Sequence, residues 1–204
     1  LPFDDARYRL AYDTFLGAGA LEDAYVLSVS AVRQAPDSTD WRRRLAQVAE
    51  WHGKPADALA QWYYLARSGH TDAWAQVLRL APGLFEHRML LDAHKFQLRQ
   101  RPRDTAQLRS IAALYERLGE PGAGIATLQA HITRYPSDAG FDALATLAER
   151  AGEGAIADDA LLAWEQHAGA SPALSLRRAA GLIVRGQLEA AMAALDTART
   201  KAPD

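Results

Sequence analysis

A chain of 204 residues with 49% hydrophobic residues, 24% charged residues and a net charge of −2 has the composition of a folded protein rather than of a disordered tail. The absence of cysteine excludes disulfides, cysteine-based zinc sites and thiol nucleophiles, and is compatible with a reducing or an oxidising compartment. No apolar run approaches the roughly 18 to 20 residues of a membrane-spanning helix, and basic and acidic residues are interleaved along the chain. We therefore expect neither direct membrane insertion nor a nucleic-acid partner.

The elements expected in chain order are pairs of helices that recur about every 34 residues. Residues typical of a stop recur at Pro36, His70, Pro102, Pro136, Pro172 and Pro203. Twelve residues before each stop lies a mostly small residue, where two helices would approach closely: Ala24, Ala58, Leu90, Gly124, Ala160 and Ala191. In four pairs a glycine five residues earlier is placed to end the first helix: Gly19, Gly53, Gly119 and Gly186. Because apolar residues follow helical spacing and show no sustained period of two, we predict twelve helices and no strands.

The predicted repeats cover residues 3–37, 38–71, 72–103, 104–137, 138–172 and 173–204. The third departs most from the pattern, since Leu90 and Gln97 replace small residues and its first helix ends early, near Pro82 and Gly83. One helix pair cannot cover its own apolar face, so neighbouring pairs are expected to stack in a single array. We expect this array to be a segment of a longer chain, because the sequence starts at Leu1 without methionine and no capping helix follows Pro203.

The pattern resembles the tetratricopeptide repeat. The clearest matches are Leu108-x-x-Ile111-Ala112-x-x-Tyr115-x-x-x-Gly119, which runs on to Pro136, and Ala24-x-x-x-Ser28-x-x-Ala31, which runs on to Pro36. The resemblance implies an all-α fold, a right-handed superhelix or α-solenoid of about six helix-turn-helix repeats. It also implies that the first helices line a concave wall, and that the chain is a non-catalytic scaffold for protein–protein interactions.

The resemblance further implies which residues face a partner. Groove positions in this family lie fifteen, eleven and eight residues before the small residue of the second helix. The polar candidates, together with one tryptophan at the groove edge, are Arg9, Asp13, Arg43, Gln47, Glu50, Trp51, Arg79, Arg109, Glu116 and Glu149. Arginine forks can hold a partner's carboxylates and the glutamates can hold its basic groups. Alternatively, these charges pair with one another at helical spacing and only keep the face soluble.

Other apolar residues divide between packing and contact. We predict that Trp62 and Trp164 pack in the core and that Trp41, like Trp51, lies near the groove edge as a candidate for contact. In the last repeat the outward positions are apolar, and we expect a following repeat to cover them: Leu176, Ile183 and Val184.

No chemistry-bearing motif is present. His87 and His94 lie seven residues apart, without the spacing of four that a metal-binding helix uses, and we expect no metal site and no cofactor. Nucleophile-elbow, P-loop and dinucleotide motifs are missing, so no catalytic residue is proposed and the chain is not expected to be an enzyme.

A second resemblance concerns one and a half repeats. The stretch Trp41-Arg42-Arg43-Arg44-Leu45-Ala46-Gln47-Val48-Ala49-Glu50-Trp51, continuing through Gly53-Lys54-Pro55-Ala56-Asp57-Ala58-Leu59 to Gln61-Trp62, resembles the repeat region of the outer-membrane protein of Pel-type exopolysaccharide secretion. It implies a periplasmic scaffold that docks a polysaccharide-modifying hydrolase/deacetylase and guides the polysaccharide, a possible second partner, toward an outer-membrane barrel. The alternatives are a cytoplasmic adaptor that clamps an acidic peptide, as co-chaperones do, and an export scaffold of cellulose or alginate type.

Overall fold

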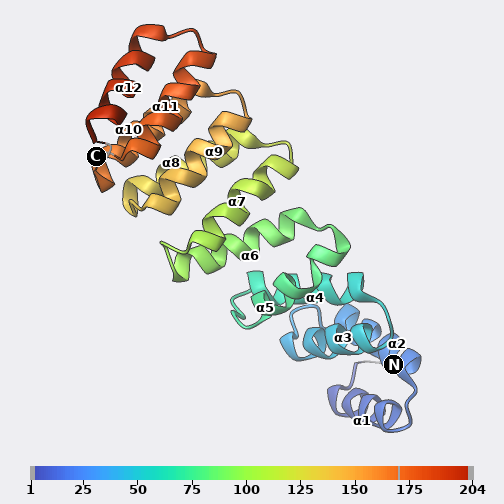
Figure 1. Cartoon of the computed structure of the whole chain (residues 1–204). Coiled ribbons are helices and arrows are strands. Elements are labelled where there is room, and N and C mark those ends of the chain that lie inside the picture. Colours follow the sequence, from blue (N-terminus) through green and yellow to red (C-terminus); the bar gives the residue numbers. More distant parts are fainter. Residues whose placement is uncertain (1–2, 170, 202–204) are drawn as a thin grey trace. The chain divides into compact units, whose positions relative to one another are not determined.

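The computed structural model describes residues 3–169 and 171–201 (Figure 1). In these residues there are twelve α-helices, one short 3-10 turn and no strand, which confirms the predicted all-α fold. The helices are α1 (Asp5–Gly17), α2 (Leu21–Gln34), α3 (Thr39–Trp51), α4 (Pro55–Arg67), α5 (Ala73–Leu80), α6 (His87–Gln100), α7 (Thr105–Arg117), α8 (Pro121–Arg134), α9 (Asp138–Arg150), α10 (Gly154–Ala168), α11 (Pro172–Val184) and α12 (Leu188–Lys201), and the 3-10 turn η1 is Pro82–Leu84.

The chain divides into two compact units, Leu1–Ala93 and His94–Asp204, and the boundary lies within α6. In the first unit, each helix from α1 to α5 packs against the next one in the chain. In the second unit, the same succession holds from α7 to α12, and α7 also packs against α9. Sequential stacking of this kind buries the apolar face that each helix pair leaves open.

Short polar side chains start the first helix of most pairs. Asp4, Ser38, Asp104, Ser137 and Ser171 each accept a hydrogen bond from a backbone N–H in the first turn of the helix that follows. Such N-caps satisfy backbone donors that have no partner inside the helix. The stops predicted between the two helices of a pair are confirmed at Gly19, Gly53, Gly119 and Gly186, which all have φ near +70°.

The third pair departs from the others, as its sequence indicates. Helix α5 has only eight residues, because Pro82 lacks the N–H that would continue the ladder and the chain tightens into η1. The helix ends near Pro82, as predicted, and the left-handed residue that ends the turn is Phe85, at φ 57°, rather than a glycine. In α6 Leu91 and Ala93 are fully buried, whereas the predicted position Leu90 is only half-buried.

The small residues predicted at close helix contacts are otherwise buried, namely Ala24, Ala58, Gly124, Ala160 and Ala191. Gly124 shows why size matters there: a Cβ built on it would lie 2.7 Å from Leu147 Cδ2 and 2.8 Å from Tyr115 Cβ. The backbone of α8 therefore approaches α7 and α9 as closely as glycine permits.

Candidate partner-binding surface

Most charged residues predicted to face a partner pair with charges on the next odd-numbered helix. We call this set the ion-pair ladder: Arg9–Asp40, Asp13–Arg44, Arg43–Asp72, Glu50–Arg79, Arg109–Asp142, Glu116–Arg150 and Glu149–Arg177, with N···O distances of 2.5–3.6 Å. The self-pairing considered from the sequence is therefore present: the ladder joins neighbouring repeats, and Arg9 also pairs with Asp5 one turn earlier in α1. Exposed pairs of this kind contribute at most about 1 kcal/mol each.

The pair of Arg43 and Asp72 is bidentate, as is the pair of Arg177 and Glu149. The Arg43 guanidinium donates two hydrogen bonds to the Asp72 carboxylate, 2.7 Å from Nη1 to Oδ2 and 3.0 Å from Nη2 to Oδ1. These hydrogen bonds hold the pKa of Asp72 below its ordinary value of 3.8 and raise the pKa of Arg43. Asp72 occupies the N-cap position of α5 but makes no capping bond, so its carboxylate serves the ladder instead.

We predict that the Asp72 carboxyl titrates below pH 3.8 in the folded chain and that Arg43→Gln moves its pKa back toward that value. Because folding lowers the pKa of this carboxyl, the pairing stabilises the folded chain fully at pH values above the pKa of the unfolded state. The contribution is lost as the pH falls through the lower pKa of the folded state. Carbon-detected NMR of the side-chain carboxyl measures the pKa of Asp72 in the unchanged chain, in Arg43→Gln and in the control variant Arg33→Gln. An Asp72 pKa that is the same in all three proteins would contradict the pairing.

The tryptophans predicted near the groove edge separate into one core residue and one exposed residue. Trp51 is 57% exposed at the end of α3, whereas Trp41 is 0% exposed. The Trp41 Nε1 donates a 2.7 Å hydrogen bond to Asp5 Oδ1, and this bond is the main cause that lowers the pKa of Asp5. The ring packs edge-on against Tyr8 and Tyr12. The prediction of Trp41 as a contact residue was wrong, because Asp5 provides the acceptor that a buried indole needs.

The remaining predictions at this surface have mixed outcomes. Trp62 is buried, as predicted, and its Nε1 donates to Glu50 Oε1 at 2.9 Å, so Glu50 is held by both Trp62 and Arg79. Trp164 is half-buried and Gln47 is exposed on α3. In the last pair Leu176, Ile183 and Val184 are exposed, and their covering by a following repeat stays a prediction.

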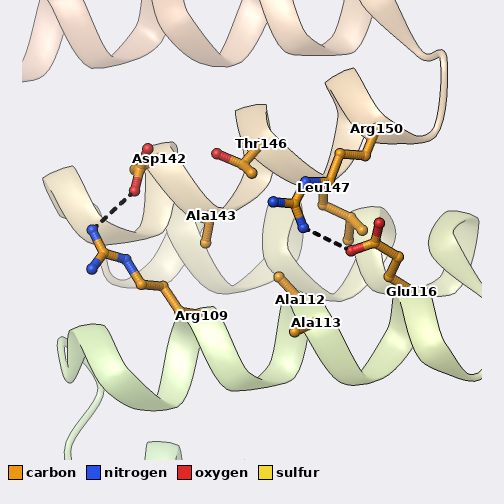
Figure 2. A pocket seen from close by; sticks show the side chains of 9 residues that line it. All are labelled: Arg109, Ala112, Ala113, Glu116, Asp142, Ala143, Thr146, Leu147 and Arg150. Carbon is orange, nitrogen blue, oxygen red and sulfur yellow. Dashed lines mark hydrogen bonds and ion pairs between the residues drawn. The ribbon is translucent and has the colours of Figure 1, made fainter.

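A pocket opens between α7 and α9, with a volume of about 390 Å3 (Figure 2). We call it the α7–α9 pocket, and its lining residues are Arg109, Ala112, Ala113, Glu116, Asp142, Ala143, Thr146, Leu147 and Arg150. Figure 2 shows the three alanines and Leu147 between two ladder pairs, Arg109–Asp142 and Glu116–Arg150. The pocket therefore has an apolar floor and one positive and one negative group at each end.

Sequence reasoning found Arg109 and Glu116 but missed the α9 side of this pocket. Asp142 and Arg150 are not at the groove positions that the family pattern supplies. A search for residues of opposite charge one repeat downstream would have identified them, since Asp142 follows Arg109 by 33 residues and Arg150 follows Glu116 by 34 residues. Whether any of the predicted residues contacts a partner stays a prediction.

In the part of the chain that the structure describes, no group of three or more His, Cys, Asp or Glu side chains is placed to hold a metal ion. None of the described helices is both long enough and apolar enough to cross a membrane.

Stacked helix pairs, most with an N-capped first helix and several with a left-handed glycine between the two helices, define an α-helical repeat fold. Among solved structures, the chain is similar to one in the structure of Naa15/Naa10 bound to HypK-THB, with a TM-score of 0.56 and 16% identity over 94% of this chain and 31% of that one. It is also similar to a tetratricopeptide repeat protein from Parabacteroides merdae ATCC 43184, with a TM-score of 0.40 and 19% identity over 98% and 80% of the two chains.

A third similar structure is YrrB, described as a tetratricopeptide repeat protein with an unusual peptide-binding site. Its TM-score is 0.46 and its identity 14%, over 87% of this chain and 93% of that one. At these identities the likeness concerns the fold alone. No protein-family model and no curated protein matches the sequence.

Proposed function

We propose that the chain is a non-catalytic scaffold that binds a segment of a partner protein in the α7–α9 pocket. The observation that carries this proposal is the combination of an apolar floor with an ion pair at each end. The floor offers space for one small apolar side chain of the partner, and the ends offer charged groups of both signs. A segment with an acidic and a basic residue on either side of an apolar one would match this arrangement.

The ladder pairs at the two ends can be exchanged at little cost. The side chain of Arg109 is 68% exposed, and its partner Asp142 also accepts a 3.0 Å hydrogen bond from Arg177 Nη1. When Arg109 turns to a partner's carboxylate, Asp142 therefore keeps a cation. At the other end, the side chain of Arg150 is 60% exposed, so it can also turn to a carboxylate of the partner.

The same charges disfavour a clamp for a purely acidic peptide at this surface. Asp142 and Glu116 line the pocket beside the two arginines, so a row of carboxylates would meet like charge at both ends. A fold similar to this one occurs in a solved complex, the structure of Naa15/Naa10 bound to HypK-THB.

The partner we propose is the hydrolase/deacetylase that modifies the polymer in a Pel-type exopolysaccharide system, with the chain in the periplasm as part of an outer-membrane export protein. The support is the resemblance of residues 41–62 to the repeats of such proteins. Trp41 and Trp62, which lie at the two ends of that stretch, are buried and belong to the packing of these helices. An export scaffold for cellulose or alginate would use the same surface for a different polymer.

We predict that Ala113→Trp lowers affinity for the partner at least tenfold, because the indole fills the α7–α9 pocket without removing a ladder pair. Ala126→Trp on the exposed side of α8 is the matched control and should bind as the unchanged chain does. The measurement is biolayer interferometry with the purified hydrolase/deacetylase. If both variants bind equally well, the pocket is not the binding site, and if the unchanged chain does not bind the enzyme, the Pel-type partner is wrong.

A further inference from the structure

A second pocket in the His94–Asp204 unit lies between α6 and α8, and we call it the α6–α8 pocket. Its volume is about 610 Å3. The buried side chains of Leu98, Ile111 and Leu128 form its base. Ile111 lies on the side of α7 away from Ala112, Ala113 and Glu116, since residues one apart in a helix point about 100° apart. The two pockets are therefore separate sites on opposite sides of α7.

The rim of the α6–α8 pocket is basic. Lys95, Arg99 and Arg134 line it together with His131 and Tyr135, and no carboxylate is among the lining residues. Arg101 and Arg103 line an adjoining cavity of about 430 Å3, which shares Tyr135 with the first. The single acid of that cavity, Asp104, accepts the capping hydrogen bond from Gln107 N at 3.1 Å.

These cations differ from the arginines of the ladder. Within residues 3–169 and 171–201, none of the three rim cations forms an ion pair with a carboxylate. Instead, Lys95 Nζ lies 4.8 Å from the ring centre of Tyr115, and Arg134 Cζ lies 5.2 Å from that of Tyr135. Cation–π contacts position a cation without neutralising it, so the positive charge remains available to a ligand.

We propose that the α6–α8 pocket binds an acidic segment of a second protein that carries one large apolar side chain. The apolar side chain would occupy the base of Leu98, Ile111 and Leu128, and flanking carboxylates would reach the cations of the rim. The charge complementarity is local, because the whole chain has a net charge of −2. This site is independent of the α7–α9 pocket, so both partners can be bound at once.

The composition of the pocket favours a peptide over a nucleic acid. Single strands bind by stacking their bases on open aromatic faces, and the base of this pocket is aliphatic. The rings of Tyr115 and Tyr135 already lie beneath the rim cations. An aliphatic base under a basic rim suits Leu or Phe between Asp and Glu residues.

The test uses fluorescence anisotropy with a labelled peptide in which a single Phe is flanked by Asp and Glu on both sides. We expect saturable binding that weakens as salt rises, and a loss of at least tenfold in the double variant Arg99→Glu and Arg134→Glu. The control with the same change in charge is Arg33→Glu and Arg117→Glu, two exposed arginines outside the pocket. Replacing this Phe by Ser in the peptide should also weaken binding at least tenfold.

A second variant keeps the test valid if the charge reversal impairs folding. Ala130→Trp fills the pocket from an exposed position of α8, while Ala126→Trp is exposed and lies outside it. The proposal would be overturned if the two double variants lost the same affinity or if Ala130→Trp bound the peptide as well as the unchanged chain does. It would also be overturned if the chain bound a short single-stranded DNA more tightly than the peptide. Ala113→Trp should bind the peptide normally, which separates this site from the proposed function of the α7–α9 pocket.

Discussion

Replacing Trp41 by alanine is expected to lower the free energy of unfolding of the Leu1–Ala93 unit by about 3–5 kcal/mol. The indole is fully buried against Tyr8 and Tyr12, so its removal opens a cavity between α1 and α3. The same change deprives Asp5 of the hydrogen bond from Nε1. Urea unfolding followed by circular dichroism measures the effect as a shift of the transition that belongs to this unit.

Trp51→Ala is the matched control, because it removes the same side chain from the same helix. Trp51 is 57% exposed, and we expect a change within about 0.5 kcal/mol. Equal shifts for the two variants would contradict the burial of Trp41. The stability of a repeat protein is a sum of the stabilities of its repeats and of the interfaces between neighbouring repeats, so the two parts of the chain can unfold in separate transitions. The midpoints of these transitions are therefore the quantity to compare.

Gly124→Val is expected to destabilise the His94–Asp204 unit by about 3 kcal/mol. The added Cβ alone would lie 2.7 Å from Leu147 Cδ2 and under 3 Å from Tyr115 Cβ and Cγ. The Cβ of Tyr115 belongs to a buried residue and cannot rotate away, so α7 and α8 would have to separate. Thermal unfolding by circular dichroism, with near-ultraviolet spectra to report on Tyr115, measures the loss.

Gly122→Val tests the same substitution one half-turn earlier in α8. A Cβ at Gly122 meets nothing within 4 Å, so this variant should be neutral or slightly more stable, because valine restricts the unfolded chain more than glycine does. A similar loss at both positions would show that helix propensity, and not the close approach at Gly124, determines the effect.

The fold was predictable because the forces that shape it are local. A small residue at each helix crossing and a glycine between the helices of a pair act within one repeat, so their spacing alone identifies the units. The third pair departs from the pattern because the chain forms a 3-10 turn at Pro82 and the left-handed residue after it is Phe85, which no pattern of glycines indicates.

The candidate sites were less predictable because they depend on contacts between repeats. Arg109 and Glu116 were found from their positions in a helix, but their partners Asp142 and Arg150 are identified only when α9 is stacked against α7. Trp41 was misassigned for a similar reason, since its burial depends on Asp5, a residue 36 positions away. The α6–α8 pocket was missed because its rim combines residues of α6 and α8, which the sequence separates.

The ion-pair ladder has a consequence for how this sequence can evolve. Each charge of the ladder has its partner one repeat away, at separations of 28–34 residues. A sign reversal at one position is therefore compensated most simply by the opposite reversal in the neighbouring repeat. In an alignment of relatives we expect Arg109 and Asp142, and likewise Glu116 and Arg150, to covary as exchanged charge pairs, while gain or loss of one complete repeat preserves the register of all the others.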